Sequence, residues 1–228
     1  MKRAVTLLPC FLLLAFVGIA ASVKKKPASD RVIGIQPFGK FPEKHTKEVK
    51  KALEGYYRCE VKVLPAVALP KEAFTKVKTP RYRADKLLDY LNKRVPDGYD
   101  HVIGLTTSDV STTKYADWAT KKIKEPEWKY KDWGIFGLGQ MPGTACLVST
   151  YRLKMKGGNV EAKLLERLRK VACHEIGHNL GLPHCEFSEK CFMRDGAESI
   201  ATVDAEAEAL CSRCAGIVGV KVKKVGSK

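Results

Sequence analysis

HEIGHNLGLPHC, residues 174–185, contains three of the five histidines of the 228-residue chain. His174 and His178 are four residues apart, so on a helix they lie one turn apart on the same face and can bind one metal ion. Gly181 tolerates the left-handed backbone that ends a helix and turns the chain. We expect this turn to bring His184 to the same ion. Three neutral imidazoles leave the fourth position around zinc to water, which is the open arrangement of a catalytic site.

Glu175 directly follows the first histidine of this stretch. Bound zinc lowers the pKa of water toward 7 and polarises a carbonyl, and a neighbouring carboxylate can accept the water's proton. We therefore expect Glu175 to be the general base of a hydrolase. The alternative is an ordinary amphipathic helix, with Glu175 in an ion pair with Arg169 or Lys170. The two remaining histidines, His45 and His101, are expected to be structural.

Strands and helices are expected to alternate along the rest of the chain, without an internal repeat. Period-two and β-branched patterns predict five strands, at residues 31–38, 59–69, 101–107, 134–140 and 144–153. The second of these is interrupted by Pro65. Four-residue apolar spacing predicts three helices, at residues 45–57, 83–95 and 159–181. We expect a long loop over residues 108–133 and a hairpin from the last two strands.

The N-terminal segment, residues 1–22, has two basic residues, an apolar run and a small-residue boundary. This pattern predicts a cleaved signal peptide and export to the periplasm or the cell exterior. The alternative is an uncleaved membrane anchor, because residues 4–21 reach the lower length limit of a span. We expect residues 23–214 to form one catalytic domain and residues 215–228 a basic C-terminal tail. No later segment is apolar enough to span a membrane.

The formal net charge of the chain is +16. Strong basicity permits binding to nucleic acid, to anionic membrane surfaces or to acidic substrates. The lysines are dispersed, as on a solvated surface. Residues 115–133 interleave lysines with aromatic residues, an arrangement that can stack nucleic-acid bases: Trp118, Trp128, Tyr130 and Trp133. Because the chain carries no signature of a nucleic-acid recognition module, nucleic acid is not the favoured partner.

Cysteines continue the pattern after the third histidine. Cys185 follows His184 directly, CFM occupies residues 191–193, and CSRC occupies residues 211–214. Together with the extended zinc motif, this order resembles the archaemetzincins, a branch of the metzincin zinc peptidases, over residues 136–214. One difference is the segment EFSEK, which places five residues between the first two cysteines where the family pattern has four.

The resemblance implies an α+β fold of the metzincin-like zincin type. Its parts would be a mixed, mostly parallel, twisted five-stranded sheet, an active-site helix with the HExxH motif and a small C-terminal subdomain. Residues 134–140 would form the antiparallel edge strand, whose free edge can pair with an extended peptide. Met193 would be the Met-turn residue, an apolar floor beneath the histidines; as an ordinary core methionine it would occupy the same place.

The activity implied is hydrolysis of peptide bonds in peptides or proteins by a monomeric enzyme. The alternative is a catalytically weak, zinc-containing binding protein whose basic surface holds an anionic partner. The resemblance also implies a second, structural zinc ion held by four thiolates: Cys185, Cys191, Cys211 and Cys214. In an oxidising compartment the same four residues can instead form two disulfides. The three other cysteines beyond the signal segment are expected to be buried core residues: Cys59, Cys146 and Cys173.

Overall fold

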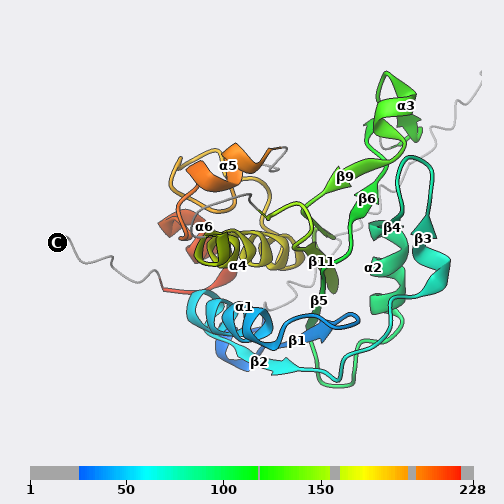
Figure 1. Cartoon of the computed structure of the whole chain (residues 1–228). Coiled ribbons are helices and arrows are strands. Elements are labelled where there is room, and N and C mark those ends of the chain that lie inside the picture. The colour runs from blue at the N-terminus through cyan, green and yellow to red at the C-terminus, as the bar shows by residue number, and fades with distance from the viewer. Residues whose placement is uncertain (1–25, 118, 155–159, 195–198, 222–228) are drawn as a thin grey trace, which may run out of the picture.

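The computed structural model describes residues 26–117, 119–154, 160–194 and 199–221. The expected signal peptide, residues 1–22, lies outside the described residues. A five-stranded sheet with the order β10-β11-β5-β1-β2 forms the centre of the molecule (Figure 1). Four strands are parallel, and they are β1 (Val32–Pro37), β2 (Glu60–Val63), β5 (His101–Thr106) and β11 (Ala145–Ser149). The fifth, β10 (Gly137–Gly139), pairs antiparallel with β11 at the edge. The mixed, mostly parallel sheet and its antiparallel edge strand confirm the expected fold class.

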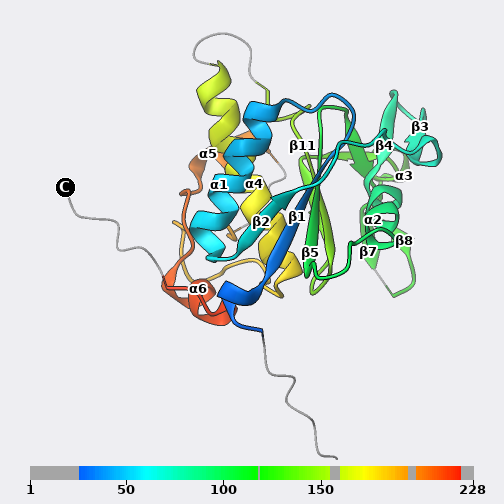
Figure 2. The same cartoon turned by 90° about the horizontal axis from the view of Figure 1, so that it is seen from below.

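Helices cover both faces of this sheet, which is why its inner strands are continuously apolar rather than alternating. Helices α1 (Glu43–Tyr57) and α4 (Val160–Asn179) lie on one face, and α2 (Ala84–Asn92) lies on the other (Figure 2). Each face has its own apolar core. The apolar residues at four-residue steps along α4 are buried in the first of these cores: Leu164, Leu168, Ala172 and Ile176.

A second, four-stranded sheet, which the sequence does not predict, lies beside the first. Its order is β3 (Phe74–Thr75), β4 (Arg81–Arg83), β6 (Val110–Thr112) and β9 (Trp133–Ile135). Between β6 and β9 the chain forms the hairpin β7 (Tyr115–Asp117) and β8 (Lys122–Ile123), followed by the short helix α3 (Glu127–Tyr130). The expected loop over residues 108–133 is therefore wrong. These elements are two to four residues long, too short to show a hydrophobic period.

Residues 134–140 do not form one strand. The chain changes sheet at Phe136, so that β9 pairs with β6 and β10 pairs with β11. Figure 1 shows β6 and β9 extending away from the central sheet toward α3. The consequence is a bent wall of two sheets, with the strand β10 at the bend.

The C-terminal part packs against α4. It contains α5 (Ile200–Ala205) and α6 (Ser212–Val218), and α6 buries Ala215 and Val218 in the first core. The folded part thus extends beyond residue 214, where we expected a tail to begin. Two short 3-10 helices, η1 (Ala28–Asp30) and η2 (Lys71–Ala73), complete the described elements. Within the described ranges, no helix is long and apolar enough to cross a membrane.

Candidate metal centre and active site

The end of α4 determines where the third histidine lies. Gly181 has a φ of +89°, its N–H donates to the carbonyl of His178 at 2.8 Å, and the N–H of Leu182 donates to Gly177 at 2.9 Å. These two hydrogen bonds are those of the Schellman motif, which reverses the chain after a helix. As a result, ring nitrogens of His174, His178 and His184 lie within 4.8 Å of one another, as the sequence predicts.

Hydrogen bonds orient two of the three imidazoles. Nδ1 of His174 donates to the carbonyl of Phe192 at 2.7 Å, and Nδ1 of His178 donates to the carbonyl of Leu182 at 2.8 Å. Because a carbonyl can only accept, Nδ1 carries the hydrogen in each ring and Nε2 is left with its lone pair. Burial, followed by the neighbouring His178, lowers the pKa of His174 to about 3, and burial also lowers the pKa of His178. Neutral, pre-oriented imidazoles fit a zinc ion.

Glu175 lies in the wall of the same site and is buried. Burial raises its pKa to about 8, against the opposing effect of a backbone hydrogen bond from Gly139. The ion pair expected in the alternative interpretation is wrong. Arg169 pairs with Glu208 and Glu48, and Lys170 pairs with Glu166. Glu175 therefore lies buried in the cleft wall and forms no ion pair with Arg169 or Lys170.

Two glycines let the edge strand β10 approach α4. A Cβ on Gly137 would lie 2.6 Å from Oε1 of Glu175, and a Cβ on Gly139 would lie 2.8 Å from the backbone oxygen of Glu175. Real Cβ atoms do not approach this closely, so a side chain at Gly137 would displace the side chain of Glu175, and one at Gly139 would clash with the backbone of α4. Sequence reasoning did not assign these residues a role, although the signal was present as Gly-Leu-Gly within the expected edge strand.

Asn179 joins the end of α4 to the hairpin of β10 and β11. Its Nδ2 donates to the backbone carbonyls of Gln140 at 3.0 Å and Ala145 at 2.9 Å, and its own backbone carbonyl accepts from the N–H of Gly143 at 3.2 Å. The two elements that form the site are therefore fixed to each other. Asn179 lies inside the zinc motif, but an asparagine at this position does not by itself predict these hydrogen bonds.

Met193 lies in the core below the histidines, fully buried. A Cβ on Gly177 would be 2.3 Å from its Sδ, so the methionine packs against α4 at Gly177, the residue before His178. The carbonyl of Met193 accepts from the N–H of Cys185 at 2.6 Å. This position is compatible with both sequence interpretations, an apolar floor and a core methionine.

The four cysteines named by the sequence form a second cluster. The Sγ atoms of Cys185, Cys191, Cys211 and Cys214 lie within 4.8 Å of one another, and all four thiols are free. The sulfurs of Cys185 and Cys211 are 3.7 Å apart, whereas a disulfide requires about 2.05 Å. Four sulfurs at about 2.3 Å around a tetrahedral zinc ion would be about 3.8 Å apart. The cluster can therefore hold a second zinc ion.

In the described part of the chain, the remaining cysteines and histidines lie outside both clusters. As expected, Cys59, Cys146 and Cys173 are buried free thiols. His45 contacts Glu161 at 3.1 Å, and His101 contacts the carbonyl of Gly143 at 3.0 Å. Both histidines have structural partners, as the sequence analysis expects.

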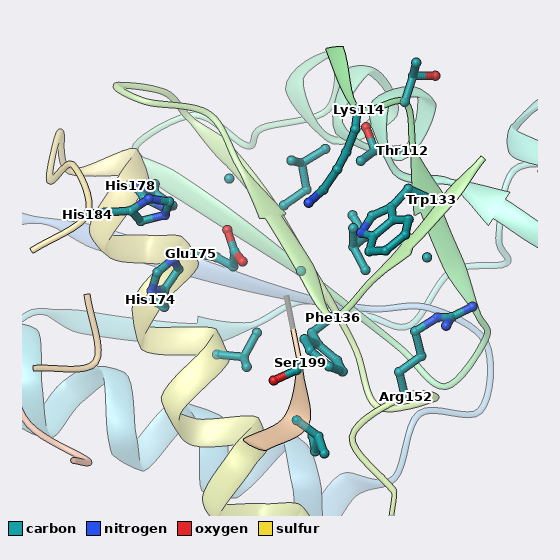
Figure 3. A pocket seen from close by; sticks show the side chains of 18 of the residues that line it. Thr112, Lys114, Trp133, Phe136, Arg152, His174, Glu175, His178, His184 and Ser199 are labelled. Atoms are coloured by element: carbon teal, nitrogen blue, oxygen red, sulfur yellow. The ribbon is translucent and has the colours of Figure 1, made fainter. Parts of the chain in front are cut away.

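A cleft of about 830 Å³ opens in front of the histidines and Glu175. Figure 3 shows the three histidines on one side of it, with Lys114, Trp133 and Arg152 on the other. The edge strand β10 forms part of its wall, and Ser199, Ile200 and Glu206 also line it. The site therefore combines a metal-binding centre, a carboxylate and a free strand edge in one open groove.

Comparison with known proteins agrees with this geometry. The model of peptidase family M54 matches residues 41–219. The archaemetzincin of Haloquadratum walsbyi is 31% identical over 189 residues, which cover 80% of this chain and 96% of that protein. The archaemetzincin of Methanopyrus kandleri is 33% identical over 171 residues, 75% of this chain and 84% of that protein.

Solved structures show the same fold. The crystal structure of archaemetzincin from Methanopyrus kandleri has a TM-score of 0.66 at 27% identity, covering 86% of this chain and 97% of that chain. That of archaemetzincin from Archaeoglobus fulgidus, complexed with malonate, has a TM-score of 0.62 at 25% identity, covering 82% and 99%. These matches favour the enzyme over the binding protein considered as an alternative. The chain belongs to peptidase family M54, the archaemetzincin family of zinc metallopeptidases.

Proposed function

We propose that this chain hydrolyses peptide bonds in peptides or proteins, with zinc held by His174, His178 and His184 and with Glu175 as the general base. The observation that carries the proposal is the position of Glu175, a buried carboxylate beside three converging imidazoles in the wall of an open cleft. A purely structural zinc site needs neither an open position nor such a carboxylate.

Glu175 has two tasks in this proposal. A bound zinc ion supplies Lewis acidity, which activates water and polarises the scissile carbonyl. The positive charge beside Glu175 would also lower its pKa from the raised value that burial produces, so that the carboxylate is ionised and can accept the water's proton. It then returns this proton to the departing amine. The free edge of β10 can hold the substrate backbone by main-chain hydrogen bonds.

The test is a pair of substitutions with a matched control. Glu175→Gln keeps the size of the side chain but removes the base, so zinc should remain bound while kcat falls by about 10² or more. His178→Ala should lose the zinc ion at this centre, measured by metal analysis. Glu161→Gln alters an exposed carboxylate of the same helix and should retain full activity. Full peptidase activity in purified Glu175→Gln would refute the assignment of the base.

We further propose that the protein is exported, as the pattern of residues 1–22 suggests. Cleavage near Ser22 would leave a short basic arm with three consecutive lysines, residues 24–26. N-terminal sequencing of the protein from its host, after cell fractionation, tests this. Protein in the cytosol that still begins at Met1 would contradict export, and uncleaved protein in the membrane fraction would indicate the anchor instead.

A further inference from the structure

The cleft wall that faces the zinc ligands is cationic. Among the described residues, the basic side chains that line it are Lys114, Lys124 and Arg152, and the acidic side chains that line the cleft are Glu175 and Glu206. Figure 3 shows the amine of Lys114 pointing into the cleft and Arg152 on the side away from the histidines. Glu175 belongs to the zinc side, so among the described lining residues the basic groups gather on the opposite wall.

Arg152 is held in a fixed orientation at this wall. Its Nε and Nη2 donate to the two carboxylate oxygens of Asp109 at 2.7 and 2.8 Å, and the side chain of Asp109 is 5% exposed. The guanidinium lies against Gly134 in β9, where a Cβ would be 2.1 Å from Cζ. A guanidinium has five N–H donors, so three remain beyond the two bonds to Asp109. The side chain keeps 34% of its surface exposed.

The carboxylates behind this wall are shared among several guanidiniums. Oδ2 of Asp109 is also 3.4 Å from Nε of Arg81, and the buried Asp132 is 3.7 Å from Arg81 and 3.9 Å from Arg83. Three guanidiniums therefore face two buried carboxylates. The third nearby carboxylate, Asp85, is half exposed and pairs with Arg83. Counting Asp85, three carboxylates balance three guanidiniums, so Arg152 contributes its remaining N–H donors to the cleft rather than a net positive charge.

Lys114 and Lys124 carry the positive charge along the same wall. Nζ of Lys114 is 4.9 Å from the centre of the Trp133 ring, which belongs to β9. The backbone N–H of Lys114 donates to the carbonyl of Tyr130 at 2.9 Å, and the backbone N–H of Lys124 donates to the carbonyl of Lys114 at 2.9 Å. Both lysines are thus anchored through their backbone beside β9.

The direction of β10 indicates which part of a substrate meets this wall. A peptide that pairs antiparallel with β10, the commoner arrangement of paired strands, runs from Gly139 toward Gly137 and then toward β9. The residues after the scissile bond therefore approach Trp133 and Gly134. At about 3.3 Å per residue, Gly134 lies at most about 10 Å beyond Gly137.

We propose that Lys114, Lys124 and Arg152 form a subsite for a substrate carboxylate roughly two to four residues on the C-terminal side of the scissile bond. This inference rests on the proposed function, because it assumes that peptides are cut at the histidine centre. The carboxylate can be an acidic side chain or the free C-terminus of a short peptide. The subsite thus gives the enzyme a preference for acidic peptides, which complements its basic charge.

The experiment compares peptides that differ only at these positions, cut by the zinc-loaded full chain. Replacing Gln by Glu two to four residues after the cut should raise kcat/KM about tenfold, as for a charge-assisted hydrogen bond. Free and amidated C-termini on otherwise equal short peptides distinguish the two sources of the carboxylate. A preference for either carboxylate supports the subsite. Equal rates for Glu and Gln, and for acid and amide, would overturn it, as would a preference confined to the N-terminal side.

Substitutions in the cationic wall test whether its side chains cause the preference for Glu peptides. Lys114→Gln combined with Lys124→Gln should reduce the tenfold ratio to about two- or threefold, while Lys122→Gln should leave it intact, since Lys122 is exposed on β8 and does not line the cleft. Arg152 is tested together with its partner, as Asp109→Asn with Arg152→Gln, so that no buried carboxylate is left unpaired. An unchanged ratio in the double-lysine variant would overturn the proposal even if the arginine variant fails to fold.

A binding measurement distinguishes a failure of this inference from a failure of the proposed function. The Glu175→Gln variant, which should not cut, is titrated with fluorescently labelled Glu and Gln peptides. The Glu peptide should bind about tenfold more tightly, and its affinity should fall with salt. Equal affinities refute the carboxylate subsite. If no peptide is cut by the wild-type chain but the Glu peptide binds preferentially, the proposed function fails and the subsite stands.

Discussion

Gly177 decides how closely Met193 packs beneath the histidines. A Cβ at this position would be 2.3 Å from Sδ of Met193 and 3.0 Å from the hydroxyl of Tyr57, both fully buried. Gly177→Ala should therefore lower the free energy of unfolding by about 1–3 kcal/mol through overpacking, against a gain of less than about 1 kcal/mol in helix propensity. The affinity for the zinc ion at His174 and His178 should fall as well. Denaturant unfolding and zinc titration measure the two effects.

The control is a glycine with free space around it. A Cβ on Gly55, near the end of α1, meets nothing within 4 Å. Gly55→Ala should raise the free energy of unfolding by about 0.5–1 kcal/mol and leave zinc binding unchanged. If both alanine variants behaved alike, packing against Met193 would not be the reason for glycine at position 177.

The residues whose chemistry repeats at fixed spacing could be predicted from the sequence. The three histidines converge as expected, because helix geometry and a glycine turn translate spacing into position, and the four cysteines converge as the family resemblance implies. Gly137, Gly139, Asn179 and Arg152 could not be assigned in this way. Their roles arise from contacts between segments far apart in the chain, as in the pair formed by Arg152 and Asp109, and spacing carries no information about such contacts.

At the level of elements, long segments with a clear period were predictable and short ones were not. The helix α4 ends two residues before its expected limit, and the central strands lie within their expected ranges. The expected strand over residues 134–140 fails because its two halves belong to different sheets. Three-residue strands are defined by tertiary pairing rather than by their own pattern. The part of the cleft wall that carries the proposed subsite therefore could not be predicted.

The contact between α4 and α5 should depend on pH. Arg167 of α4 is almost fully buried and donates to both oxygens of Asp204 in α5, at 2.7 and 2.5 Å. These hydrogen bonds hold the pKa of Asp204 below its ordinary value. A carboxyl whose pKa is depressed by folding stabilises the protein above its unfolded pKa of about 3.9, and this stabilisation disappears as the pH falls through the folded value.

Asp204→Asn should therefore lower the free energy of unfolding by about 2 kcal/mol near neutral pH. The difference from wild type should shrink below pH ~4, because the wild-type carboxyl then also becomes neutral. Urea unfolding of both proteins at several pH values measures this difference. Any loss of metal at low pH affects both proteins equally and therefore cancels in the difference. A difference that stays constant between neutral and acidic pH would show that the charge of Asp204 is not the stabilising feature.

In the whole molecule the two metal-binding clusters are connected. Cys185 follows His184 directly, and Cys191 precedes Phe192, whose carbonyl holds His174. The cysteine cluster also joins the segment after α4 to the start of α6, where Cys211 is the N-cap residue. A metal ion among the four thiolates would thus fix both the C-terminal subdomain and two parts of the histidine site. The sequence predicts the cysteine cluster, but its connection to the histidine site is seen only in the folded structure.

We predict that the intact protein binds two zinc ions per chain, the second one at the four cysteines. Cys214→Ser should remove that ion, destabilise the protein by several kcal/mol and weaken zinc binding at the histidines, because binding energy of a structural zinc is folding energy. Cys59→Ala, outside both clusters, should still bind two. Metal analysis and intact mass decide the point. One zinc ion together with a mass four hydrogens below that of the reduced chain would mean two disulfides instead, and would leave the argument for Glu175 unaffected.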